Sequence, residues 1–378
     1  MDPKAPPLPP RKPQSLRSAQ SIHPQANPPS TPWVHGSYYP SWRIYRGAKP
    51  SSMDLAITTH LFYAFARVHP DGTIYHLDEK ADLQLPVDGT TGSLAACLAQ
   101  KQSHPHLRLL LSIGGSSGSS TFAEVASSEV TRDRFAASAR HFIDRYNFDG
   151  VDIDWEHPKD PVQGHDYLSL LQTCRTHFPS PQYLLTSALP TGEWCLRNID
   201  IPTVATTLDW INLMCYDFSG PWTELSGHQS QLYSPEHPHN AFAKRSCDAA
   251  VKYLFSRGVP GSKIVIGVPV YGRSFLGTDN IGQKFTGHFS EASGVIEYKD
   301  LPRTGAVEYV DWNVGAAFSV GGDAGFVSYD VPVTVTAKAQ FVKQMGLRGL
   351  FYWTGVADAP PNHGDRSLIR AGWTGLHK

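Results

Sequence analysis

The sequence lacks a long apolar run and an excess of charge of either sign. No stretch of about 18 apolar residues could span a bilayer, and no run near the amino terminus resembles a signal-peptide core. The 33 basic and 34 acidic residues give a net charge of −1, which favours neither a nucleic-acid nor an anionic-membrane partner. We therefore expect a neutral substrate, no nucleic-acid or membrane partner, and a cytoplasmic protein or one exported by a non-classical route.

Cysteine is also scarce. The five cysteines are odd in number and widely spaced, and no C-x-x-C pair is present for a metal or redox site. None of the asparagines begins an N-x-[ST] acceptor for glycosylation. These absences favour free thiols in a reducing compartment.

Residues 1–32 differ in composition from the rest of the chain. They hold ten of the 30 prolines, no aromatic residue and a charge of +3, which predicts a disordered Pro-rich tail. The run Pro7–Lys12 could dock as a polyproline helix on an SH3-type groove, although a solvated tail is the simpler interpretation. Residues 33–378 must then form the folded domain.

From Val34 onward, short apolar runs alternate with more polar segments of helical period, as in parallel β-α units. The helix candidates are Arg132–Tyr146, His165–His177, Ala241–Arg257 and Val333–Met345. We predict an α/β protein with eight strands, a (β/α)8 TIM barrel. The strand candidates are Val34–Tyr39, His60–Ala66, Arg108–Ile113, Gly150–Asp154, Tyr183–Leu189, Trp210–Tyr216, Ile264–Val270 and Gly349–Trp353.

The alternation breaks after strand seven. Residues 275–330 are rich in Gly, Thr, Val and Tyr without a helical period. We predict a small α+β insertion between strand 7 and helix 7, which would rise beside the carboxyl face of the barrel and deepen a cleft there. A stand-alone second domain is the alternative.

Carboxylates cluster in the segment Phe148–Pro158. Because side chains alternate along a strand, Asp152, Asp154 and Glu156 should point to one face, and the apolar residues between them to the other. Acids this close in a desolvated pocket cannot all ionise near pH 7, so at least one proton is held between them. This pattern predicts a catalytic site. A magnesium or calcium site and a structural acidic rim are alternatives, but the chain has no phosphate loop, and burying three acids without a role is costly.

The residues Asp149, Asp152, Asp154 and Glu156 resemble the D-x-x-D-x-D-x-E signature of family 18 glycoside hydrolases, the chitinases and their relatives. Four further segments resemble motifs of the same family. They are Ser112–Gly115 (S-x-G-G), Met214–Asp217 (M-x-Y-D), Gly267–Phe275 (G-x-P-x-Y-G-R) and Gly349–Trp353. The resemblance covers about Trp33 to the end of the chain. Within the family, the chain resembles the type of chitinase that has an α+β insertion domain.

The resemblance implies a retaining mechanism in which the substrate supplies the nucleophile. Glu156 would protonate the glycosidic oxygen while the 2-acetamido carbonyl attacks the anomeric carbon, giving an oxazolinium ion. Asp154 would orient the acetamido group, Asp152 would share a proton with Asp154, and Tyr216 would hold the acetamido oxygen. No cofactor and no metal are implied.

The resemblance also implies a set of substrate-binding residues. Among them, Tyr38 and Ser112 would support Asp152, Asp217 would hold a sugar hydroxyl, and Trp353 would stack on the distorted sugar. Of the remaining tryptophans, Trp42 and Trp222 are the best candidates for sugar binding, and Asp149 should anchor a turn. The full set is Tyr38, Phe65, Ser112, Gly115, Met214, Asp217, Trp222, Tyr271, Arg273 and Trp353.

Two positions depart from the family pattern. Ser116 stands where many chitinases have a tryptophan, so we expect weaker binding of distant non-reducing sugars. His157 stands where a tyrosine commonly follows the catalytic glutamate, which places a second titratable group beside the acid. The implied function is that of a monomeric chitinase acting on chitin or chitooligosaccharides by hydrolysis of β-1,4 bonds between N-acetylglucosamine units. A chitin-binding lectin on the same fold and an endo-β-N-acetylglucosaminidase are the alternatives.

Overall fold

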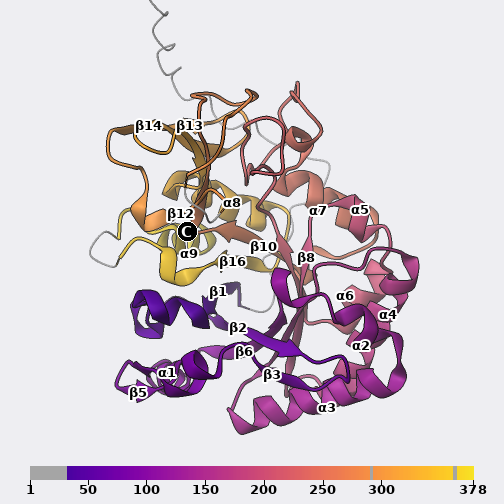
Figure 1. Ribbon diagram of the computed structural model, residues 1–378. Helices are drawn as coiled ribbons and strands as arrows, with labels where there is room; N and C mark the ends of the chain where they lie inside the picture. Colours follow the sequence, from indigo (N-terminus) through magenta and orange to yellow (C-terminus); the bar gives the residue numbers. More distant parts are fainter. Residues whose placement is uncertain (1–31, 290–292, 361–363) are drawn as a thin grey trace, which may run out of the picture.

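The computed structural model describes residues 32–289, 293–360 and 364–378, and it contains a closed barrel of eight parallel strands. The strands follow the order β1-β16-β10-β9-β8-β7-β6-β2, and pairing of β1 with β2 closes the ring. Figure 1 shows the barrel strands with helices around them. The (β/α)8 prediction is confirmed. The barrel strands are β1 Val34–Pro40, β2 His60–Val68, β6 Arg108–Gly114, β7 Gly150–Asp154, β8 Leu184–Pro190, β9 Trp210–Met214, β10 Ile264–Pro269 and β16 Gly349–Trp353.

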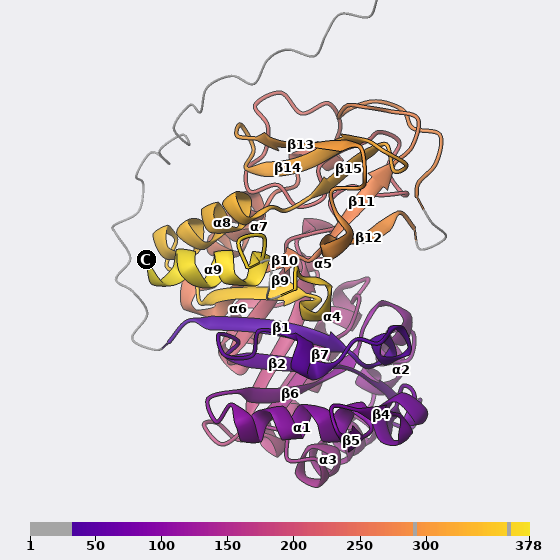
Figure 2. The same ribbon diagram turned by 90° about the vertical axis from the view of Figure 1, so that its left-hand side faces the viewer.

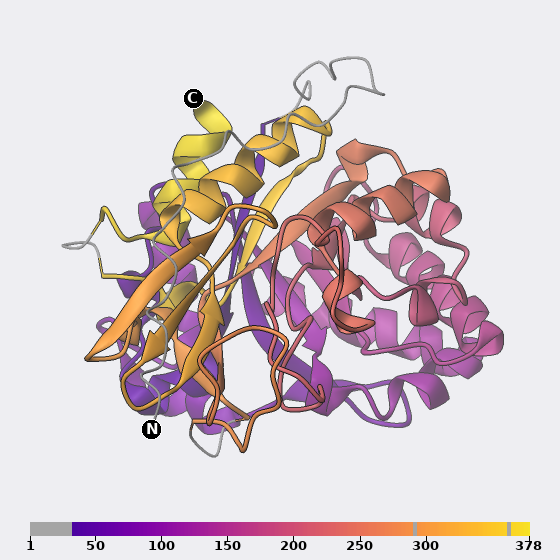
Figure 3. The same ribbon diagram turned by 90° about the horizontal axis from the view of Figure 1, so that it is seen from above.

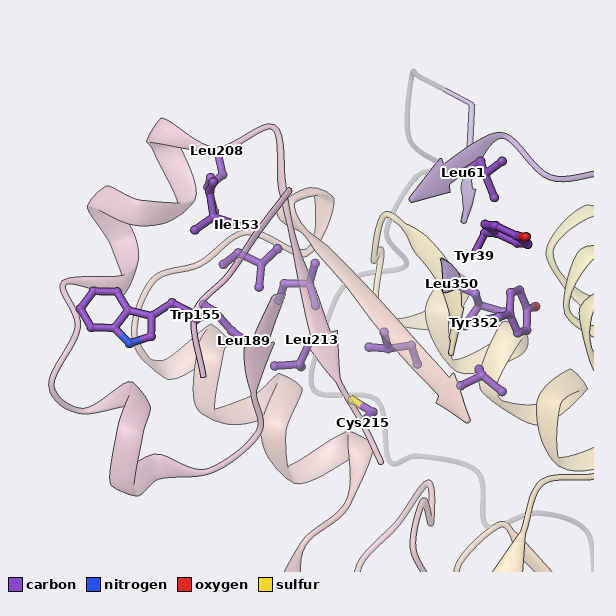
Figure 4. Packing of buried hydrophobic residues seen from close by; sticks show 14 of the residues in the cluster. Tyr39, Leu61, Ile153, Trp155, Leu189, Leu208, Leu213, Cys215, Leu350 and Tyr352 are labelled. Atoms are coloured by element: carbon purple, nitrogen blue, oxygen red, sulfur yellow. The ribbon is translucent and has the colours of Figure 1, made fainter. Parts of the chain in front are cut away.

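Two apolar layers explain why the sequences of these strands are almost continuously hydrophobic. One lies inside the barrel, where Phe62, Leu110 and Phe351 pack together. The other lies between the strands and the surrounding helices, where Ile153, Trp155 and other residues are buried (Figure 4). A parallel strand covered on both faces needs apolar side chains in both directions, with polar residues only at its ends or in a functional interior.

Helices surround the barrel, and capping residues fix the starts of several of them. Asp160 accepts a hydrogen bond from the Gln163 N–H and is followed by Pro161, and Ser246 accepts from the Ala249 N–H. The helices are α1 Ser93–Ser103, α2 Phe122–Ser127, α3 Glu129–Arg145, α4 Pro161–His177, α5 Glu193–Leu196, α6 Ile201–Thr207, α7 Cys247–Ser256, α8 Pro332–Gln344 and α9 Leu368–His377.

The segment between β10 and α8 forms a separate antiparallel sheet with the order β12-β11-β15-β14-β13. Figure 2 shows this sheet, in orange, above the barrel strands, and Figure 3 shows it from above. Among its described residues the only helical element is a 3-10 helix, Tyr298–Asp300, so the helical part of the predicted α+β module is small. The strands are β11 Tyr271–Phe275, β12 Val295–Glu297, β13 Ala306–Asp311, β14 Ala316–Gly321 and β15 Phe326–Tyr329.

Element boundaries differ from the predictions by a few residues. The predicted strand Trp210–Tyr216 ends at Met214, and the predicted helix Ala241–Arg257 begins only at Cys247, where Ser246 caps it. Three short strands, β3 Ile74–His76, β4 Pro86–Val87 and β5 Thr90–Thr91, were not expected. Nearly all of the predicted tail 1–32 lies outside the described residues. Within the described part of the chain, no helix combines the length and the apolar character needed to cross a membrane.

Candidate active site

The predicted acids lie at the carboxyl end of β7, where the ends of the parallel strands converge. Asp152 and Asp154 are buried on the interior side of the strand. Val151, Ile153 and Trp155 belong to the outer layer, where the Trp155 ring stacks on Phe122 at 5.7 Å. The strand itself ends at Asp154, and Glu156 follows two residues later. The alternation expected from the sequence therefore holds along this segment.

Asp152 lies deepest and is held by four side-chain donors. Its Oδ2 accepts from the hydroxyls of Tyr38 and Ser112, both at 2.8 Å. Its Oδ1 accepts from the Thr186 hydroxyl at 2.7 Å and from the Asn212 amide at 3.2 Å. Burial raises the pKa of Asp152, and these hydrogen bonds oppose that shift. Tyr38 and Ser112 are themselves buried, and both donate to the same carboxylate oxygen.

Asp154 is buried with one oxygen unused. Burial, followed by the charges of Glu156 and Asp152, raises the pKa of Asp154 well above its usual range. Its Oδ1 is buried and has no hydrogen-bond partner within the described structure. A buried acceptor of this kind costs free energy until a donor reaches it, so Asp154 is poised to bind an N–H or O–H group.

Glu156 is the outermost acid and is half-buried at the mouth of the barrel. Burial, with a smaller contribution from the charge of Asp217, raises its pKa to about 7. Its backbone N–H donates to the Ser119 hydroxyl at 2.8 Å. A glutamic acid with this pKa keeps its proton in a large fraction of molecules near neutral pH, as a general acid must.

Two glycines bring the end of β6 against β7. The Gly115 N–H donates to the Asp154 carbonyl at 2.8 Å. Gly114 and Gly115 have φ of 115° and 78°, and a Cβ at Gly114 would lie 2.2 Å from the same carbonyl oxygen. A Cβ at Gly115 would lie 2.6 Å from the Phe65 ring. Only glycine therefore allows β6, Asp154 and Phe65 to approach this closely.

Polar groups from the segment after β9 and from the inserted sheet meet near the acids. The Asp217 carboxylate accepts from the Tyr271 hydroxyl and from Arg273 Nε, both at 2.8 Å. The Arg273 guanidinium lies 4.8 Å from the Trp222 ring centroid, and the Trp222 side chain is 48% exposed. Tyr216 is partly buried beside Tyr271, and burial raises its pKa well above the usual range.

Aromatic rings from β16, β2, β1 and the segment after β1, which are neighbours in the barrel, form a row. Trp353 lies 5.7 Å from Phe65 and 5.3 Å from Tyr38 between ring centroids. Phe65 stacks in turn on Trp42, which is 36% exposed. Met214 and Trp353 are partly buried against the apolar interior of the barrel. Phe65, Met214 and Trp353 thus lie at or near the carboxyl ends of their strands.

Asp149 lies elsewhere. Its carboxylate accepts from the Leu109 N–H at 2.8 Å and pairs with Lys101 and Arg108 at the amino end of β7. These contacts lie at the turn before β7, away from the other acids, where Asp149 was expected to anchor a turn. Within the described residues, no cluster of three or more His, Cys, Asp or Glu side chains could hold a metal ion.

Sequence reasoning missed several residues that build the site. Thr186 and Asn212 donate to Asp152 from β8 and β9, and Ser119 holds the backbone of Glu156. Arg67 binds the Gly114 carbonyl and the Ser117 hydroxyl and lies near Asp154. The only available signal was position, because Thr186 and Asn212 interrupt otherwise apolar strands.

Comparison with known proteins gives a consistent result. The model of glycosyl hydrolases family 18 matches residues 35–358. The chain is 35% identical over 366 residues to Chitinase 1 of Aphanocladium album, covering 91% of this chain and 85% of that protein. A Group IV chitinase of Ostrinia furnacalis matches the structure with a TM-score of 0.81 and 27% identity, covering 91% and 99% of the two chains. A mutant class V chitinase of Nicotiana tobaccum in complex with NAG4 matches with a TM-score of 0.78 and 25% identity, covering 92% and 99%.

Proposed function

The chain belongs to family 18 of the glycosyl hydrolases and is a glycoside hydrolase, and on that premise we propose that it is a chitinase. Its substrate would be chitin or chitooligosaccharides, cleaved at β-1,4 bonds between N-acetylglucosamine units. The names of the relatives support this choice, as does the NAG4 bound by the class V chitinase. One observation carries the mechanism: an acid with a pKa of about 7 stands beside a buried aspartate with an unpartnered oxygen.

In the first step, Glu156 gives its proton to the glycosidic oxygen, and the bond between that oxygen and the anomeric carbon breaks. The carbonyl oxygen of the 2-acetamido group on the same sugar forms a new bond to the anomeric carbon, which yields an oxazolinium ion. The substrate thus supplies the nucleophile, and no residue of the chain becomes covalently linked to it.

Asp154 assists this step through its free oxygen. Oδ1 would accept a hydrogen bond from the acetamido N–H, which turns the carbonyl toward the anomeric carbon and stabilises the positive charge that develops. The hydroxyl of Tyr216, which is partly buried beside Tyr271, would donate a hydrogen bond to the acetamido oxygen. The four donors around Asp152 fix the position of β7 and so the position of Asp154.

In the second step, the Glu156 carboxylate takes a proton from water as the resulting hydroxyl attacks the anomeric carbon. The oxazolinium ring opens, the acetamido group is restored, and the sugar keeps its original configuration. Trp353 would form the floor beneath this sugar, since its ring is partly exposed at the end of β16. Met214 would pack beside the acetamido methyl group.

The decisive experiment compares the unmodified chain with Glu156→Gln on chitin oligosaccharides. We expect the variant to lose at least about a thousandfold in kcat, because the amide cannot donate the proton. Glu124→Gln, at an exposed glutamate on α2, is the matched control and should keep full activity. Equal turnover by Glu156→Gln and the parent enzyme would disprove the mechanism.

The same assay separates the alternative functions. A lectin would bind the oligosaccharide in calorimetry and leave it intact over days, whereas a chitinase would release chitobiose or other short products. An endo-β-N-acetylglucosaminidase would cleave a high-mannose glycopeptide faster than a chitin oligomer. A product profile against oligomers of increasing length would also distinguish exo from endo action.

A further inference from the structure

An exposed indole stands next to the proposed acid on the side of β8. Trp194 lies in α5, just beyond the carboxyl end of β8, and 49% of its surface is exposed. Its ring centroid is 5.5 Å from that of His157, and the two planes meet at 76°. His157 Nε2 in turn lies 3.8 Å from a carboxylate oxygen of Glu156. Only one side chain therefore separates the indole from the reacting group.

The position of Trp194 is fixed although its ring is not buried. The adjacent Cys195 and Leu196 are fully buried, and the Cys195 thiol donates to the Pro158 carbonyl at 3.6 Å. This contact ties α5 to the segment that carries Glu156. At Gly192, a Cβ would come within 2.3 Å of the indole Nε1, so the glycine leaves room for the ring in its present place.

His157 completes a shelf of two rings. Burial lowers the pKa of His157 to about 4, so the imidazole is neutral at the pH where Glu156 keeps its proton. On the β6 side of Glu156, Ser116 and Ser117 are exposed and small, so they contribute no ring there. An apolar surface beside the acid is thus supplied from the β8 side.

The order of the strands indicates which part of the substrate would meet this shelf. The row of Trp353, Phe65 and Trp42 comes from β16, β2 and the segment after β1, which are neighbours in the barrel. Trp194 follows β8, which lies across the barrel from those strands. In the proposed mechanism, the sugar that carries the reacting acetamido group lies on Trp353. A substrate chain that continues past Glu156 therefore meets Trp194 with the sugars on the leaving-group side of the scissile bond.

We propose that Trp194, supported by His157, binds a sugar on the leaving-group side of the scissile bond and thereby sets the affinity for acceptor sugars. This inference rests on the proposed chitinase function. The apolar face of a pyranose ring would pack against the exposed indole, which lies only one side chain away from the proposed catalytic acid.

The test measures cleavage of chitohexaose and the share of it converted by transfer into products longer than six sugars. Transfer requires an acceptor sugar on the leaving-group side. Trp194→Ala should lower kcat/KM for chitohexaose by about fivefold to tenfold and reduce the share of transfer products at least as strongly. Trp194→Phe, which restores a ring, should recover most of both values, and Tyr75→Ala, at another exposed aromatic residue, should leave them unchanged.

Trp194→Ala should keep the melting temperature of the parent, because half of the side chain is exposed. If Trp194→Ala cleaves chitohexaose and transfers sugars as the parent does, the inference is wrong while the proposed function stands. Equal losses in Trp194→Phe and Trp194→Ala would also overturn it, because the ring would then not be the cause. A parent chain that leaves chitohexaose uncut would overturn the proposed function and the inference with it.

Discussion

The charge of one residue, Asp217, influences the pH range in which Glu156 can act as an acid. Burial is the main cause of the raised pKa of about 7, and repulsion from the Asp217 carboxylate is the second. A general acid works only while protonated, so kcat/KM should fall as the pH rises through about 7. The raised pKa also means that the folded state binds this proton more tightly than the unfolded chain. The tighter binding of this proton therefore stabilises the folded state at low pH, and the stabilisation is lost as the pH rises through the pKa of Glu156 in the folded state.

Asp217→Asn should move the alkaline limb of the kcat/KM profile to lower pH. The substitution removes a negative charge near Glu156, so the ionised form of Glu156 becomes less unfavourable and its pKa falls. The variant should also be slower, because it loses contacts to Tyr271 and Arg273. The pH at which the limb falls still reports the pKa of Glu156, whatever the maximal rate. Asp323→Asn removes the same charge from an exposed turn and should leave the limb in place. An unshifted limb in Asp217→Asn would contradict the assignment.

Thr186 shows how a residue without a motif can support the acids. Its hydroxyl donates to the buried Asp152 carboxylate at 2.7 Å, so Thr186→Val removes a hydrogen bond to a charged group while keeping the shape of the side chain. We expect a loss of about 2 kcal/mol in the free energy of unfolding, measured by urea denaturation at pH 7. Thr186→Ser keeps the hydroxyl and should lose much less. Equal stabilities of the valine variant and the parent would show that this bond contributes nothing.

The site residues that could be predicted from the sequence differ from the missed ones in how far along the chain their partners lie. Asp152 and Asp154 lie on one strand and Glu156 follows it by two residues, so their spacing along one extended segment is a local pattern that the sequence shows. Thr186 and Asn212 reach the same pocket from β8 and β9, and their partner lies 34 and 60 residues away. Their role depends on the closure of the barrel and on side-chain rotamers, which no local pattern contains.

At the scale of elements, the turn at the end of β6 depends on Gly114 and Gly115. The local sequence pattern alone would predict only an ordinary loop there. Gly115→Ala combines a left-handed backbone with a Cβ that would overlap the Phe65 ring. We expect a loss of about 3 kcal/mol or more in the free energy of unfolding. Gly258→Ala is the control, because its φ is also positive, at 84°, but nothing lies within 4 Å of the added Cβ. It should lose only about 1 to 2 kcal/mol. Similar losses in both variants would contradict the steric argument.

The barrel strands could be located within about two residues because burial on both faces makes them continuous apolar runs. The strands of the inserted sheet could not be separated. In β13, Val307 and Tyr309 are exposed while Ala306 and Glu308 are partly buried, so apolar and polar side chains do not mark the two faces. The short helices α2, α5 and α6 were missed for a related reason, since each is too short to show a helical period.

For the molecule as a whole, the inserted sheet forms a wall that is fixed to the barrel rather than a freely tethered module. The guanidinium of Arg366, which precedes α9, donates to Glu308 of β13 at 3.0 Å, and the Arg366 carbonyl accepts a hydrogen bond from the Tyr298 hydroxyl. Arg43, next to Trp42, pairs with Glu297 of β12. Because Tyr271 and Arg273 of the site lie on the first strand of this sheet, a fixed wall keeps their hydrogen bonds to Asp217 in register with the acids on β7.

A buried ion pair lies where the wall returns to the barrel. Asp330 follows β15 and binds Lys338 of α8 at 2.6 Å, with both side chains almost fully buried, and Lys338 also donates to the Ser230 hydroxyl. Asp330→Ala would leave the ammonium buried without a counter-charge, so we expect a loss of about 3 to 5 kcal/mol in a urea titration.

Replacing both partners, as in Asp330→Ala with Lys338→Met, removes the isolated charge and should recover much of that loss. The exposed pair of Arg303 and Asp323 offers a comparison, and Asp323→Ala should cost less than about 1 kcal/mol. If the double variant were as unstable as Asp330→Ala alone, the cost would come from lost packing rather than from an unpaired charge. The attachment of the wall would then depend on the shape of this junction and not on its electrostatics.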